Sequence, residues 1–258
     1  MHLLLTRAST RLLPDAPAHH GPLPPLLVVL TFVTGLVDAV SCLGLGHIFV
    51  ANMTGNVVFL GFALAGDPQS SAGSSVLALL AFTAGALTGR RLPRALPRAV
   101  SPFPALICAH AALVAAACVA DLAGWGPRTL ITLLAMGMGM QNMVVRKLAV
   151  PDLTTTILTL TLTGLASERP GPAAGRRAVS ITVMFLGALV GGFLQLRFGC
   201  AASLAPAALL LLSVALLAAR PGCPVGSAPP LRGGPDHERR RADGPPPGVR
   251  WSGRAEEG

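Results

Sequence analysis

Eight long apolar runs dominate the 258-residue chain and decide the kind of fold that it can adopt. As helices rising about 1.5 Å per residue, most of them would cover the roughly 30 Å hydrocarbon core of a bilayer. They are apolar on all sides, whereas a surface helix of a soluble protein has one apolar stripe. Charged residues make up 12% of the chain, against about 25% in soluble domains. The sequence therefore predicts an all-α integral membrane protein, with runs at 25–46, 48–66, 74–91, 104–123, 128–145, 152–167, 178–197 and 202–219.

Two polar segments flank the apolar region. Residues 1–24 contain Arg7 and Arg11 among several prolines and lack a signal-peptide core followed by a small-residue cleavage site. Residues 220–258 are rich in Pro, Gly and Arg and have too few apolar side chains to form a core, so we expect a disordered tail.

The apolar region itself contains an internal repeat. Four short matches occur in the same order, each pair roughly 100 positions apart, and their shared order favours duplication over coincidence. We therefore divide the region into a first membrane repeat at 25–123 and a second at 124–219. The matches are Gly85-Ala-Leu-Thr-Gly89 with Gly187-Ala-Leu-Val-Gly191, Pro104-Ala-Leu with Pro206-Ala-Ala, Asn52-Met-Thr with Asp152-Leu-Thr and, more weakly, Val37-Asp-Ala with Met140-Gln-Asn.

The basic residues distinguish between topologies. If the second and sixth runs each enter and leave on one face, six spans remain, and the basic residues gather on one side. That side would be cytoplasmic and would hold both termini, as expected for a multi-pass protein of the cytoplasmic (inner) membrane. Three spans per repeat make the halves inverted, with a broken or re-entrant segment in each. A seven-span alternative would place Arg7 and Arg11 outside. In the six-span version, only Arg128 and Arg197 lie outside, opposite Arg7, Arg11, the 90–98 and 169–177 clusters, Arg146, Lys147 and Arg220.

Asp38 is the most unusual residue of the first run. A charge at the centre of a membrane helix costs about 2.5–3.5 kcal/mol on insertion scales. Two interpretations remain open: a hydrogen-bonded carboxyl that holds helices together, and a site for a substrate, proton or cation.

Two polar clusters precede the short apolar stretches at corresponding places in the repeat. Both consist of residue types that cap helix N-termini. If these helices begin inside the membrane, their first N–H groups face a cavity and favour a polar or anionic ligand group; alternatively, the side chains only cap the helices. The clusters are Asn52, Thr54 and Asn56, and Asp152, Thr154, Thr155 and Thr156. Gln141 and Asn142 would face Asp38 across the repeat axis and complete a central binding site.

Four glycines fit a role in helix packing. Small residues spaced four apart let membrane helices approach closely. We expect this role for Gly85, Gly89, Gly187 and Gly191.

Other classes of function find little support. The five cysteines have unrelated spacings without a CxxC pair, so no metal site or cofactor is expected. No hydrolase elbow, HExxH or phosphate loop is present, which argues against an enzyme. The net charge of +9 lies in short clusters between apolar runs, with 4% aromatic residues, and indicates topology rather than nucleic-acid binding.

Two stretches of the first half resemble the bacterial YoaK family, a domain of unknown function (number 1275). They are Gly35-Leu-Val-Asp-Ala-Val-Ser-Cys-Leu-Gly-Leu-Gly46 and Phe49-Val-Ala-Asn-Met-Thr-Gly-Asn-Val-Val-Phe-Leu-Gly61. Gly139-Met-Gln-Asn142 and Val150-Pro-Asp-Leu-Thr-Thr-Thr-Ile-Leu-Thr-Leu-Thr-Leu-Thr-Gly164 extend the resemblance to the second half, over about 25–219 in all. Members are described as inner-membrane proteins of unknown function, some of them as small-molecule permeases. The resemblance thus implies the membrane class and is compatible with transport.

The expected function is a small-molecule or ion permease that works by alternating access between two inverted halves. The alternative is a membrane component that does not transport, such as a scaffold or sensor. The expected partners are the lipid bilayer and an unidentified solute; the sequence leaves a homo-oligomer open.

Overall fold

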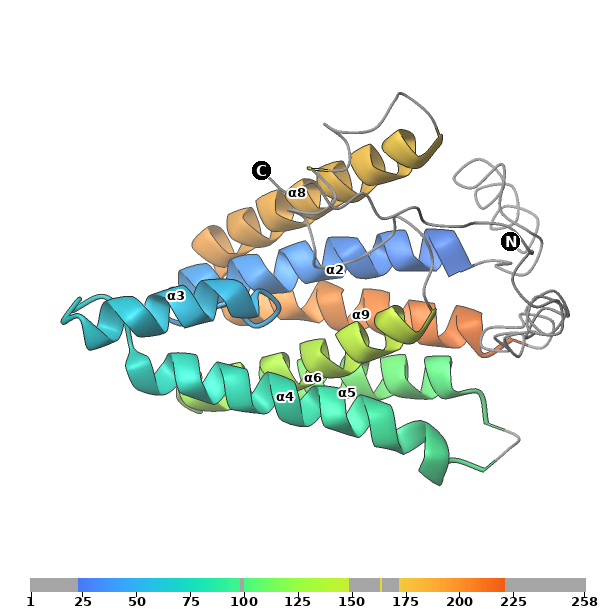
Figure 1. Cartoon of the computed structure of the whole chain (residues 1–258), viewed down its shortest axis with the longest axis horizontal. Coiled ribbons are helices and arrows are strands. Elements are labelled where there is room, and N and C mark those ends of the chain that lie inside the picture. The colour runs from blue at the N-terminus through green and yellow to red at the C-terminus, as the bar shows by residue number, and fades with distance from the viewer. Residues whose placement is uncertain (1–22, 98–99, 149–162, 164–171, 221–258) are drawn as a thin grey trace, which may run out of the picture. The chain divides into compact units, whose positions relative to one another are not determined.

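The computed structural model describes residues 23–97, 100–148, 163 and 172–220. These residues all belong to one compact unit, residues 1–226, and the second unit, 227–258, lies outside them. The regular elements of the described residues are α-helices (Figure 1). They are α2 (Leu23–Gly44), α3 (Met53–Leu64), α4 (Ala72–Ala95), α5 (Pro102–Leu122), α6 (Pro127–Leu148), α8 (Pro172–Phe198) and α9 (Cys200–Ala218).

Five of these helices are long and apolar enough to cross a membrane: α2, α4, α5, α8 and α9. Helix α6 is equally long at 22 residues but less apolar, because it carries Arg128, Gln141 and Asn142. Helix α3 has 12 residues and would rise about 18 Å, well short of the hydrocarbon core. The expectation of an all-α membrane protein is confirmed, and the second apolar run does not form a complete crossing.

The long helices alternate in direction (Figure 1). One end of the bundle, here called the basic end, holds the N-termini of α2, α5 and α8 and the C-termini of α4, α6 and α9. The opposite end, here called the loop end, holds the connections 45–52, 65–71 and 123–126 and the single residue Gly199. Helix α3 follows α2, which ends at the loop end, and precedes α4, which begins there. The segment that contains α3 therefore enters and leaves the bundle at the loop end.

Charged residues divide between the two ends. Arg128 lies in the first turn of α6 and Arg197 in the last turn of α8, both at the loop end. The other basic residues of the described helices lie near the basic end, where Lys147 Nζ donates a hydrogen bond to the carbonyl oxygen of Arg90 at 3.4 Å. They are Arg90, Arg91, Arg94, Arg146, Lys147, Arg176 and Arg177, followed by Arg220 just beyond α9.

Glycines bring two helix pairs into backbone contact. A β-carbon at Gly85 of α4 would overlap the Met136 carbonyl oxygen of α6, and one at Gly187 of α8 would overlap the Phe32 carbonyl oxygen of α2. One turn further on, Gly89 lies against Met140 of α6, and Gly191 lies against Leu36 of α2. Since larger side chains would push these backbones apart, the α4–α6 and α2–α8 contacts depend on glycine.

Apolar side chains form both the interior and much of the outside. Leu30, Ile107 and Leu134, from α2, α5 and α6, are fully buried. In contrast, α8 presents Phe185, Leu189 and other large apolar residues at its surface. Since exposed apolar surface of this extent is unfavourable in water, the outer faces of α8 and its neighbours are suited to contact lipid.

Candidate functional site

The chain reverses sharply after α2 and returns toward the bundle. The N–H groups of Leu45 and His47 donate to the carbonyl oxygens of Ser41 and Cys42, both at 3.1 Å, which closes the helix. Gly46 and His47 follow with φ values of 82° and 59°. This left-handed backbone suits glycine and is unusual for histidine. It directs residues 48–52 back alongside α2, where Ile48 is almost fully buried.

The returning segment 48–52 is not helical, and side chains satisfy its backbone. The Oδ1 atom of Asp38 accepts hydrogen bonds from the N–H groups of Ala51 at 2.9 Å and Val50 at 3.3 Å. Oδ1 of Asn56 accepts from the Phe49 N–H at 2.9 Å, and Nδ2 of Asn56 donates to the Phe49 carbonyl at 2.6 Å. Irregular backbone is tolerated at membrane depth only when protein or trapped water satisfies it. Asp38 and Asn56 therefore make this path of the chain feasible.

The start of α3 lies next to the same segment. Asn52 caps the helix, and its side-chain oxygen accepts from the Gly55 N–H at 3.4 Å. Thr54, two residues further on, is exposed. The three polar residues of this cluster therefore differ in role: Asn56 is buried in the turn, Asn52 caps α3, and Thr54 faces outward.

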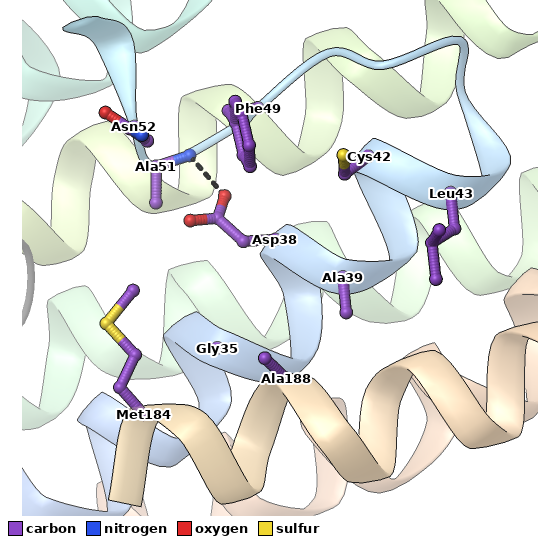
Figure 2. Close-up of a pocket in the computed structure, with 10 residues that line it drawn as sticks. All are labelled: Gly35, Asp38, Ala39, Cys42, Leu43, Phe49, Ala51, Asn52, Met184 and Ala188. Atoms are coloured by element: carbon purple, nitrogen blue, oxygen red, sulfur yellow. Dashed lines mark hydrogen bonds between the residues drawn. The ribbon is translucent and has the colours of Figure 1, made fainter. Parts of the chain in front are cut away.

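A hollow of about 400 Å³ lies between α2, α8 and the returning segment. Figure 2 shows the Asp38 side chain with one carboxylate oxygen held by Ala51 and the other directed away from it. Asp38 is 7% exposed, and its second oxygen, Oδ2, has no hydrogen-bond or ionic partner among the described residues. The described residues that line it, none of them basic, are Gly35, Asp38, Ala39, Cys42, Leu43, Phe49, Ala51, Asn52, Met184 and Ala188.

Among the predicted site residues that the structure describes, Asp38 and Asn52 line this hollow. Gln141 lies elsewhere: its Nε2 atom donates to Thr34 Oγ1 at 2.9 Å, one turn before Asp38 on α2. Asn142 follows Gln141 on α6 and is absent from the lining. The second predicted cluster, Asp152 with Thr154, Thr155 and Thr156, lies outside the described residues.

Gln141 belongs to a buried polar contact at the centre of the bundle. Thr34, Gln141 and His110 are each at most 1% exposed. A β-carbon at Gly137 would overlap the His110 ring, so the imidazole of α5 packs closely against the α6 backbone. The sequence predicted a ligand role for Gln141, whereas the structure places Gln141 with His110 in this helix interface.

The apolar half of the hollow was not foreseen. Phe49 belongs to the returning segment, and Met184 and Ala188 come from α8, far along the chain. One sequence signal did point to α8, because Gly187 and Gly191 were expected to pack closely against another helix. That helix is α2, whose Gly35 contacts Met184 and Ala188. Met184 itself carries no chemical signature that would distinguish it from other apolar residues.

Comparison with known proteins places the chain in a family. The model of the family described as "Protein of unknown function (DUF1275)" matches residues 26–217. The chain belongs to this family. It is also 34% identical over 152 residues to the UPF0700 transmembrane protein YoaK of Bacillus subtilis (strain 168), a match that covers 57% of the chain and 67% of that protein. No solved structure gives a significant match. The family membership agrees with the resemblance found in the sequence and with the membrane class.

Proposed function

We propose that this family member is a permease of the cytoplasmic membrane that moves a small molecule or ion by alternating access. The observation that carries the proposal is Asp38, a buried carboxylate with one oxygen committed to the returning segment and the other left for the hollow. Ionisable groups inside membrane segments are costly, and those that persist usually mark binding sites or ion pathways.

Two related halves support this mechanism. The contacts of Gly85 and Gly89 with α6 have the same pattern as those of Gly187 and Gly191 with α2. The facing helices also contribute a glycine to each contact: Gly139 of α6 packs against the α4 backbone, and Gly35 of α2 packs against the α8 backbone. Helices α2 and α6 run in opposite directions, as do α4 and α8 (Figure 1). Such inverted pairs are common in secondary transporters, which rock one half against the other.

The distribution of charge supports an orientation. Basic residues at the ends of membrane helices favour the cytoplasm, so the basic end would face inward. Since α2 starts and α9 ends there, both termini of the membrane domain would then be cytoplasmic. Asp38 lies about 9 Å along α2 from the loop end, which puts the hollow in the outer half of the bilayer.

Transport by the purified protein tests the proposal. Full-length protein in proteoliposomes is incubated with a defined panel of cationic, neutral and anionic small solutes, and the washed lumen is assayed by mass spectrometry. We expect the wild type to accumulate at least one solute above protein-free vesicles, and the D38N variant to lose most of that uptake. The matched control is D67N, which changes a partly exposed aspartate between α3 and α4. Uptake no greater than in protein-free vesicles for every solute would favour the scaffold or sensor alternative.

Asp67 is suited to this control because it is charged at neutral pH. A hydrogen bond from the Ser70 hydroxyl, and a second from the Gln69 N–H, hold the pKa of the Asp67 carboxyl below its ordinary value. Its substitution therefore removes the same formal charge at the same end of the protein, outside the hollow.

A further inference from the structure

We propose that the hollow at Asp38 binds a small monovalent organic cation, with its charged nitrogen at Asp38 Oδ2 and its apolar body against Phe49 and Met184. The inference names a substrate class for the proposed permease and rests on that function for its biological role. Binding itself can be measured without transport.

The charge of the hollow determines the sign of the ligand. The Asp38 carboxylate lines it, and no Lys, Arg or His side chain is among the described residues of the lining. Oδ1 is already occupied by the Ala51 and Val50 N–H groups, so Oδ2 is the acceptor left for a ligand. A buried charge is unfavourable unless it is paired, and a cation at Oδ2 would supply the missing partner.

The apolar lining selects an organic rather than an inorganic cation. Ca²⁺ takes six to eight oxygen ligands and Mg²⁺ holds an octahedral shell, whereas in the part of the lining that the structure describes the side-chain oxygens come from Asp38 and Asn52. No group of three or more His, Cys, Asp or Glu side chains suited to a metal occurs among the described residues. Phe49, Leu43 and Met184 instead offer carbon and sulfur surface. An aromatic ring beside a carboxylate is a recurring way to bind alkylammonium groups.

An anion suits the site less well, although α3 begins nearby. The side chain of Asn52 already accepts from the Gly55 N–H, and its carbonyl accepts from the Asn56 N–H at 3.4 Å. An anion in the hollow would also lie next to the Asp38 carboxylate, and like charges at short range repel.

Three ligands of similar shape but different charge test the inference. Choline is compared with 3,3-dimethylbutan-1-ol, in which carbon replaces the quaternary nitrogen, and with the anion 3,3-dimethylbutanoate. Binding to the full-length protein in detergent is followed by melting temperature and by calorimetry, since a ligand that binds the folded state stabilises it. We expect choline to bind at millimolar or lower concentration and the two other probes not to bind. Equal binding of the neutral probe, stronger binding of the anion, or no binding of choline to folded protein would each overturn the inference.

Three variants locate the binding site. D38N keeps an oxygen for the Ala51 N–H but removes the charge, and we expect the Kd for choline to rise by at least about thirtyfold. D67N should leave the Kd unchanged. Should D38N fold poorly, A39L serves instead: it fills the hollow while leaving the carboxylate, and we expect it to weaken binding as well. Choline binding that survives both D38N and A39L in folded protein would place the cation elsewhere and refute the site.

The two proposals fail in different ways. Choline binding at Asp38 without uptake of any solute would leave the cation site intact and refute the permease. Uptake of neutral or anionic solutes without choline binding would leave the permease intact and refute the cation site.

Discussion

The side chain of Asn56 clamps the backbone of Phe49 by hydrogen bonds in both directions. It accepts from the Phe49 N–H at 2.9 Å and donates to the Phe49 carbonyl at 2.6 Å. Asn56 is fully buried, so water does not readily replace these bonds. The clamp fixes the returning segment that carries Phe49 into the hollow, and thereby links the stability of the loop to the shape of the candidate site.

Substitution of Asn56 by Ala should therefore destabilise the protein. It leaves the N–H and the carbonyl of Phe49 without partners, and each buried unsatisfied group costs about 1–3 kcal/mol. We expect a loss of at least about 2 kcal/mol in the free energy of unfolding, measured by chemical unfolding in mixed micelles. The control T54A changes an exposed residue two positions earlier and should stay within about 0.5 kcal/mol of the wild type. Equal stability of N56A and T54A would show that the clamp contributes nothing.

Glycine substitutions test the two backbone contacts between helices. G85A and G187A should each destabilise by about 1–3 kcal/mol, because the added methyl group overlaps a carbonyl oxygen of the facing helix. G89L and G191L, which add larger side chains at the next turn, should impair folding or expression. The control is G61A in α3, where an added β-carbon would meet no atom within 4 Å. Melting temperatures in detergent that match the wild type for the first four variants would remove the close-packing argument.

Single cysteines in a cysteine-free background test the orientation. At Arg94, Arg146 and Arg176, near the basic end, they should be protected from an impermeant thiol reagent in intact cells. Cysteines at Arg128 and Arg197, which are exposed at the loop end, should react and so provide the positive control. Labelling of any basic-end position from outside would refute the six-span arrangement.

The long helices could be predicted because an apolar run of membrane length has few alternatives to a helix. The apolar run at 48–66 was less informative, since its first part is the non-helical segment 48–52 and the helix begins at Met53. The turn just before this run has left-handed backbone at Gly46 and His47, and left-handed histidine is uncommon enough to be missed in a sequence.

Part of the candidate site could be predicted as well. Asp38 and Asn52 are polar residues in apolar stretches, so the sequence itself singles them out. Met184 and Ala188 are apolar residues in an apolar stretch, so nothing in the sequence singles them out. The sequence match aligned Asp38 of the first half with Gln141 of the second. In the structure, Gly35 and Gly139 make equivalent contacts, and this alignment makes Asn142 the counterpart of Asp38. A shift of one residue turns a helix by about 100°, which explains why Gln141 faces Thr34 rather than the hollow.

The distance between the two polar clusters is the last prediction, and it bears directly on a shared central site. We expect Asn52–Asn56 and Asp152–Thr156 to lie within about half the roughly 30 Å thickness of the hydrocarbon core. The hydrogen bond between Gln141 and Thr34 supports this expectation, because it joins α6 to α2 one turn from Asp38. If the second half repeats the first, the cluster at 152–156 would lie beside Asn142 as Asn52 lies beside Asp38.

Spin labels on cysteines at Asn52 and Thr154 would measure this distance in liposomes. Labels at Asn52 and Arg94 provide the control, since Arg94 lies in the last turn of α4 at the basic end and should give a clearly longer distance. If the 52–154 distance equals or exceeds that of the control, the clusters belong to opposite membrane surfaces. A single central site built from both clusters would then be ruled out, and the hollow at Asp38 would have to act alone.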